Sequence, residues 1–179
     1  MANGANAFSY LVGTLLDLFI TAVMLRLLLQ WVRADFYNPV CQFLVKVTNP
    51  ALAPLRRVIP AIGRLDTAAL VLMLALEILG VWVVSRIASS PLTPAHIVLF
   101  SITKLLATLL MTYFFLIIAA VILSWVGTNL RHPVIPLVYQ LTEPVMRPIR
   151  KVIPPIAGID LSPVFALIGI RFLLLLLGW

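Results

Sequence analysis

Cysteine and charged side chains are both scarce in this sequence. Its 179 residues include one cysteine, Cys41, with two histidines and six acidic residues, and only 11% of them are charged. A single cysteine cannot form an internal disulfide or a multi-cysteine metal site. A chain that is 63% hydrophobic also lacks the polar surface that an ordinary soluble domain needs. These shortages exclude a disulfide-stabilised scaffold and argue against a water-soluble fold.

Motifs of enzymes, metal centres and nucleic-acid-binding proteins are missing as well. The sequence contains no glycine-rich phosphate loop, nucleophile elbow or zinc motif. His96 and His132 lie far apart, without carboxylates or thiols at metal-ligand spacing. The basic residues are few and are not interleaved with aromatic side chains. We therefore expect a non-enzymatic protein with no cofactor, no metal and no nucleic acid partner.

Long runs of apolar residues dominate the sequence. The mean hydropathy is +1.13, and four runs are near or above the roughly 18–20 residues that cross about 30 Å of hydrocarbon as a helix. Because lipid offers no hydrogen bonds to the backbone, helices are the expected form. We predict transmembrane helices over 8–32, 66–84, 97–125 and 162–179. The first run follows no basic residue and contains Asp17 and Arg26, so we expect a helix there and not a cleaved signal.

Basic residues gather in two of the three connecting segments. Residues 33–65 and 126–161 hold most of them, whereas the middle loop, residues 85–96, holds only Arg86. Under the positive-inside rule the two basic segments lie in the cytoplasm and both chain termini lie on the opposite side.

The two basic segments are copies of one another. A shift of 94 residues, without any insertion, places Trp31 on Trp125 and aligns a shared motif, Thr-x-Pro-x-x-x-Pro-[Leu/Ile]-Arg-[Arg/Lys]-Val-Ile-Pro, followed by an aspartate. Its structural positions are Pro50, Pro54, Pro60 and Asp66 in one copy and Pro144, Pro148, Pro154 and Asp160 in the other. Matching prolines are not a by-product of apolar composition, so the sequence indicates a duplication. We predict repeats at 1–92 and 93–179, inserted in parallel about an axis along the membrane normal.

Each basic segment should begin with a short amphipathic helix. Asn38-Pro39 is typical of a helix start, and a stripe of apolar residues follows in each copy, which predicts interfacial helices over 39–47 and 133–141. The stripes consist of Val40, Phe43, Leu44 and Val47, and of Val134, Leu137, Val138 and Leu141. The motif prolines then predict an extended or broken stretch. Asp66 and Asp160 are expected to cap the returning helices.

The repeated motif, the Leu-x-Trp runs at Leu29–Trp31 and Leu123–Trp125, and Asp160–Pro163 resemble the YggT family. The first copy departs from the pattern by lacking the Ser-Pro after Asp66. The resemblance implies a bacterial inner-membrane protein and no established catalytic residue. It also implies links to osmotic stress and potassium uptake, to cell division and, in plastid relatives, to cytochrome maturation and nucleoid distribution.

Three charged residues inside the predicted helices are candidates for a functional role: Asp17, Glu77 and Arg171. Glu77 and Arg171 are related by the same shift of 94 residues, so they should lie at matching depth. They can form a structural ion pair between the repeats, or an ion or proton path. Asp17 has Lys104 or Arg86 as a candidate partner, or faces a hydrated vestibule. Lys104 and Arg26 are expected to extend toward the headgroups.

The motif cations Arg56, Arg57, Arg150 and Lys151 have two interpretations. They bind anionic lipid headgroups or only set the orientation of the chain in the membrane, or they form a docking surface for a membrane or cytoplasmic protein. The sequence thus predicts an all-α membrane protein with four transmembrane helices. Because four helices leave only a narrow path within one monomer, we also expect that the chain can form homo-oligomers. We expect a scaffold or assembly factor, and an ion-uptake or osmotic-adaptation component is the alternative.

Overall fold

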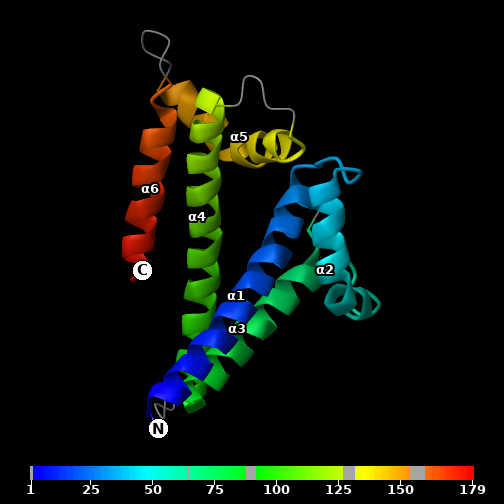
Figure 1. Ribbon diagram of the computed structural model, residues 1–179, viewed down its shortest axis with the longest axis vertical. Coiled ribbons are helices and arrows are strands. Elements are labelled where there is room, and N and C mark those ends of the chain that lie inside the picture. The colour runs from blue at the N-terminus through cyan, green and yellow to red at the C-terminus, as the bar shows by residue number, and fades with distance from the viewer. Residues whose placement is uncertain (1, 64, 88–91, 127–131, 154–159) are drawn as a thin grey trace. The chain divides into compact units, whose positions relative to one another are not determined.

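The computed structural model describes residues 2–63, 65–87, 92–126, 132–153 and 160–179, and these residues are largely helical (Figure 1). Beyond the helices they contain one isolated β-bridge, between Ile62 and Leu65. The helices are α1 (Ala2–Trp31), α2 (Pro39–Arg56), α3 (Thr67–Ile87), α4 (Pro94–Val126), α5 (Val134–Val152) and α6 (Ser162–Leu176). The predicted all-α class is confirmed for this part of the chain. Pro154 of the second motif lies outside the described residues.

Three of these helices are long and apolar enough to cross a membrane: α3, α4 and the Ala7–Trp31 part of α1. Helix α6 is apolar but has 15 residues, which is about 22 Å of helix. Large hydrophobic side chains point outward, and Leu18 on α1 and Phe115 on α4 are each 63% exposed. Such surfaces suit hydrocarbon and not water. The apolar helices indicate a membrane protein.

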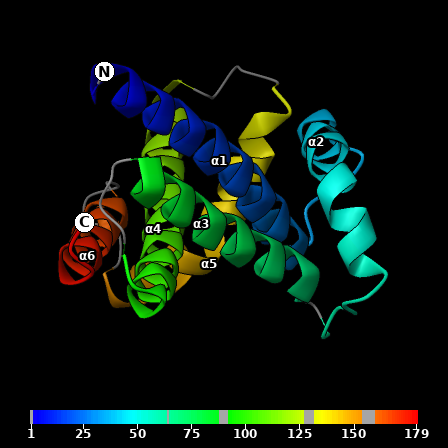
Figure 2. The same ribbon diagram turned by 90° about the horizontal axis from the view of Figure 1, so that it is seen from below.

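The chain forms two packing units. The first unit contains Met1–Leu27 and Gln42–Leu106, which is most of α1, most of α2, all of α3 and the start of α4. In it α1 and α3 lie side by side (Figures 1 and 2). A β-carbon added to Gly80 would lie 3.2 Å from Leu16 Cδ1, so a glycine there lets the two helices approach closely.

The second unit contains Leu28–Cys41 and Ala107–Trp179. Its core joins α4, α5 and α6, with Ile117, Met146, Ile170 and Leu174 buried together. Figure 1 shows α5 running across α4 and α6. The buried face of α5 includes the predicted stripe residues Leu137, Val138 and Leu141. The predicted stripe of α5 is therefore largely buried within the protein.

Helices α2 and α5 do not stop where the prolines predicted. The expected interfacial helices ended at residues 47 and 141, with a broken stretch to follow. Instead α2 contains Pro50 and Pro54, and α5 contains Pro144 and Pro148. In each helix the two prolines are four residues apart and both are exposed. The rings and the lost N–H groups therefore share one outer face, where the freed carbonyls can find other partners.

The first stripe is also only partly buried. Leu44 is buried, but Phe43 is 63% exposed and Val47 is 39% exposed. The inner face of α2 continues instead through Thr48 and Leu52, both fully buried. This face follows the longer helix, which the prediction of a helix ending at residue 47 could not include.

Two of the three predicted helix starts are confirmed. The Val40 amide donates to Asn38 Oδ1 at 2.9 Å, and the Ala69 amide donates to Asp66 Oδ1 at 3.3 Å, so Asn38 and Asp66 cap α2 and α3. The third prediction is wrong by one residue, because the N-cap of α6 is Leu161. Asp160 Oδ1 accepts the Ser162 amide at 2.9 Å, which forms a turn just before the helix.

Candidate functional sites

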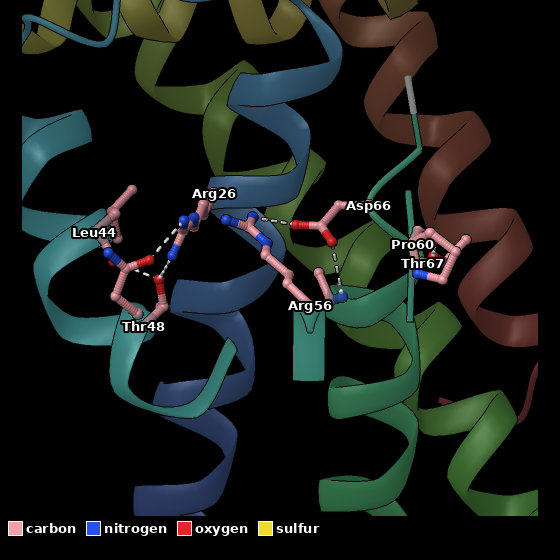
Figure 3. A network of polar contacts seen from close by, with 9 residues as sticks. Arg26, Leu44, Thr48, Arg56, Pro60, Asp66 and Thr67 are labelled. Atoms are coloured by element: carbon pink, nitrogen blue, oxygen red, sulfur yellow. Dashed lines mark hydrogen bonds and ion pairs between the residues drawn. The ribbon is translucent and has the colours of Figure 1, made fainter. Parts of the chain in front are cut away.

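An ion pair joins two residues of the first motif that are ten positions apart in the sequence. Arg56, at the end of α2, donates from Nη2 to Asp66 Oδ2, immediately before α3 (Figure 3). The Thr67 hydroxyl donates to the Pro60 carbonyl at 2.5 Å, and this second contact stabilises the same loop. The Asp66 side chain is 5% exposed and that of Arg56 is 36% exposed. This contact fixes where the chain turns back from the basic segment into α3.

The second motif contains the equivalent ion pair. Arg150 Nε donates to Asp160 Oδ2 at 2.9 Å, and Arg150 Nη1 donates to Glu143 Oε2 at 3.1 Å. Burial would raise the pKa of Asp160, but hydrogen bonds from Ser162 and Arg150 and the charge of Arg150 outweigh it and lower that pKa. We call the pairs Arg56–Asp66 and Arg150–Asp160 the motif braces.

The motif arginines and aspartates pair with each other, a structural role that the sequence analysis did not predict. Arg56 and Arg150 were expected to meet lipid or partners, and Asp66 and Asp160 to cap helices, without a contact between them. The available signal was an arginine and an aspartate ten residues apart in both copies. The remaining motif cations, Arg57 and Lys151, are exposed. Their assignment to lipid or to a partner stays a prediction.

Arg26 lies at the centre of the contact between α1 and α2. It is 6% exposed, and its guanidinium donates to Thr48 Oγ1 at 2.6 Å and to Asn49 Oδ1 at 2.9 Å (Figure 3). The Thr48 hydroxyl in turn donates to the Leu44 carbonyl at 2.6 Å. The expectation that Arg26 extends to the headgroups is therefore wrong, because polar groups of α2 satisfy it.

A groove lies in the second unit between the end of α1 and α5. Its volume is about 530 Å³, and it is lined by Trp31, Val32, Gln140, Glu143, Pro144, Arg147 and Pro148. Trp31 is 53% exposed. The lining combines an aromatic ring, two motif prolines and charges of both signs. We call it the Trp31 groove.

A cluster of charges lies among the apolar helices of the first unit. The Lys104 ammonium on α4 lies 2.6 Å from Asp17 Oδ1 on α1 and 3.1 Å from Glu77 Oε2 on α3. We call these three residues the Lys104 cluster. Asp17 therefore meets Lys104, one of its two candidate cations, and the expectation that Lys104 extends to the headgroups is wrong.

Glu77 is the most buried member of the Lys104 cluster, at 1% exposure. Its ion pair with Lys104 is close, yet neither carboxylate oxygen has a hydrogen bond of good geometry among the described residues. The Ser101 hydroxyl, fully buried one helical turn before Lys104, has none either. Arg171 belongs to the other unit, and the pair of Glu77 with Arg171 stays a prediction.

Cys41 shows no sign of reactivity. It is 1% exposed. Burial, helped by the charge of Asp35, raises the pKa of its thiol, so little thiolate forms at neutral pH. Among the described ranges, no group of three or more His, Cys, Asp or Glu residues could hold a metal ion.

Comparison with known proteins decides the family. The family model of CCB3/YggT matches residues 5–87 and 99–179, which agrees with two repeats. The chain belongs to the CCB3/YggT family. An "Uncharacterized protein in proC 3'region" of Vibrio alginolyticus is 41% identical over 97% of this chain and 94% of its own length.

Two further relatives support the same assignment. "Uncharacterized protein PA0392" of Pseudomonas aeruginosa is 38% identical, with 94% of this chain and 86% of the relative aligned. "Uncharacterized protein YggT" of Escherichia coli K12 is 37% identical, over 88% and 82% of the two chains. No solved structure matches this YggT-family chain. The resemblance seen in the repeated motif is confirmed, and it places the chain in a membrane-protein family whose role these names leave open.

Proposed function

We propose that this chain is a non-enzymatic scaffold or assembly factor of the bacterial inner membrane, acting in envelope biogenesis or cell division. In the arrangement we propose, α6 is a fourth crossing, both termini are periplasmic and both motif braces face the cytoplasm. The observation that carries the proposal is the recurrence of one brace in both repeats, at Arg56–Asp66 and Arg150–Asp160. Both braces lie in segments outside the candidate membrane spans, where protein partners or anionic headgroups can be reached.

The braces support docking because they hold the basic segments in a defined shape. Each joins the end of an amphipathic helix to the residues before the next helix. Arg57 and Lys151, next to the braced arginines, remain exposed. A rigid surface that carries free charge binds at a lower ordering cost than a flexible loop does.

The Trp31 groove supports a protein partner over lipid alone. Aromatic side chains and arginine are enriched where protein interfaces carry most of their binding energy. Trp31 and Arg147 line this groove together with Glu143, so charges of both signs are available to a peptide segment. We expect a partner segment with one apolar side chain beside Trp31 and a carboxylate at Arg147.

Site-specific photo-crosslinking in cells tests the proposal. A photoreactive residue at position 57, 147 or 151 should yield one and the same crosslinked partner, and Trp31→Ala should reduce that product at all three positions. The matched control is position 86, in the last turn of α3, where no such product is expected. Crosslinks to lipid alone at the motif positions, or equal products at position 86, contradict partner docking.

An ion-uptake or osmotic-adaptation component is the second candidate function. The Lys104 cluster favours it, because ionisable groups inside apolar helices are costly and commonly mark ion or proton pathways. Proteoliposomes of the purified protein test it through potassium and proton flux. Flux that disappears with Glu77→Gln and persists with Asp66→Asn supports this candidate. Silent proteoliposomes contradict it.

A further inference from the structure

The Lys104 cluster has one positive charge for two carboxyl groups. Lys104 contacts Asp17 and Glu77, which come from two different helices. On these helices the next basic groups are Arg26, Arg86 and His96, eight or nine residues away along their own helices, which is about 12–14 Å. Arg26 is bound to Thr48 and Asn49, and Arg86 lies over the Trp82 ring at 5.8 Å. With both carboxyl groups ionised, the cluster would carry one uncompensated negative charge among apolar helices.

The two carboxyl groups differ in how well they are satisfied. Asp17 Oδ1 lies 2.6 Å from the Lys104 ammonium and accepts a hydrogen bond from it, and the Asp17 side chain is 46% exposed. Glu77 is 1% exposed, and both of its oxygens lack a directed hydrogen bond among the described residues. Lys104 thus makes its closer contact with Asp17. The excess negative charge would therefore lie on Glu77, where burial makes an ionised carboxylate most costly.

A buried carboxylate without compensation becomes neutral by taking up a proton. We propose that the Lys104 cluster is a proton-binding site, in which Glu77 holds one proton as a neutral carboxylic acid while Asp17 and Lys104 form the ion pair. Glu77 then contributes an O–H donor to a region where the buried Ser101 hydroxyl also lacks a partner among the described residues. The inference needs α1, α3 and α4 to lie in the membrane, and it holds whether or not an ion crosses.

Dicyclohexylcarbodiimide tests the proton directly in the full-length protein. This apolar reagent enters membranes and attacks protonated carboxyl groups. The acid proton moves to a reagent nitrogen, the carboxylate oxygen bonds to the central carbon, and rearrangement leaves a stable N-acylurea with every atom of the reagent retained. At neutral pH we expect one adduct per chain by intact mass, mapped to the α3 peptide that contains Glu77. Glu77→Gln should abolish it.

Substitution of Asp17 distinguishes the effect of charge from the effect of burial on Glu77. In Asp17→Asn the Lys104 ammonium has only Glu77 to offset, so Glu77 should ionise and its adduct should fall about tenfold or more. The conservative control Asp35→Asn, at an exposed position outside the cluster, should keep the wild-type adduct. Equal labelling of wild type and Asp17→Asn overturns the proposal, because simple burial of Glu77 would then explain its reactivity.

Infrared spectroscopy provides a second readout of the same proton without any labelling reagent. A protonated carboxylic acid has a carbonyl stretching band well separated from the carboxylate bands. At neutral pH this band should be present, and it should be absent from Glu77→Gln measured under the same conditions. An unlabelled Glu77 together with no such band in the wild type overturns the proposal.

Discussion

Each motif brace joins one arginine to one aspartate ten residues later, yet the two braces differ in burial. The Asp66 side chain is 5% exposed, whereas the Asp160 side chain is 33% exposed. Water screens an exposed ion pair and weakens it, whereas a half-buried pair is more costly to break. The same residues in the two repeats therefore form pairs of different strength.

Double-mutant cycles should resolve this difference. We expect a coupling energy of about 1–2 kcal/mol for Arg56 with Asp66 and below about 1 kcal/mol for Arg150 with Asp160. The measurement is the free energy of unfolding in mixed detergent micelles for Arg56→Gln, Asp66→Asn and the double variant, and for the matching set at positions 150 and 160. A larger coupling at the second brace would contradict the assigned effect of burial.

The lowered pKa of Asp160 gives this residue a definite pH dependence. Because its folded pKa lies below the ordinary value of 3.8, ionised Asp160 stabilises the fold above that pH. This contribution is lost as the pH falls from 3.8 through the lower folded pKa. The stability difference between wild type and Asp160→Asn, measured by acid titration, should therefore shrink in that range. A difference that stays constant there would contradict the brace.

At the scale of helices, the sequence predicted those features that depend on neighbouring residues. The cap of α2 by Asn38 and the apolar stripe of α5 follow from spacing of a few residues, and both are confirmed. The proline-containing second halves of α2 and α5 were missed, because tolerance of proline depends on which face is exposed. That information exists only once the helix is packed.

The contact between Lys104 and Glu77 was within reach of sequence reasoning and was still missed. Glu77 lies ten residues before the end of α3, and Lys104 lies ten residues after the start of α4. An antiparallel helix pair with a short connection places such positions side by side. Asp17 is 87 residues from Lys104. The sequence offered Lys104 and Arg86 as its candidate cations, and the packing of the first unit selects Lys104.

Gly80 lies where α1 and α3 approach each other closely. A β-carbon at Gly80 would lie 3.2 Å from Leu16 Cδ1, a flexible tip that can move for one methyl group. We expect Gly80→Ala to be nearly neutral and Gly80→Val to destabilise the protein by about 1–3 kcal/mol through overpacking. Thermal unfolding in detergent measures both.

Gly13 provides the matched control for this helix pair. A β-carbon there would lie 4.0 Å from Val84 Cγ2, an ordinary contact distance. Gly13→Ala should therefore leave the unfolding temperature unchanged. Equal effects of valine at the two glycines would show that helix propensity, and not close approach, limits this position.

At the scale of the whole molecule, the proposed arrangement makes a prediction about sidedness. Single cysteines at positions 57 and 151 should react with a membrane-impermeant maleimide from one side of the membrane, and a cysteine at position 86 from the other, because parallel repeats place both motifs on one face. Cys41→Ser provides the background, although the buried native thiol should itself label slowly. Labelling of positions 57 and 151 from opposite sides would contradict parallel insertion.

The Lys104 cluster makes the two halves of the duplicated chain chemically dependent on each other. Asp17 and Glu77 come from the half before the short loop, and their shared ammonium comes from the half after it. A fragment that stops in that loop would place Asp17 and Glu77 among apolar helices without the Lys104 ammonium that contacts both. Neither half, produced alone, should therefore be stable in the bilayer, whereas the two halves produced together should associate.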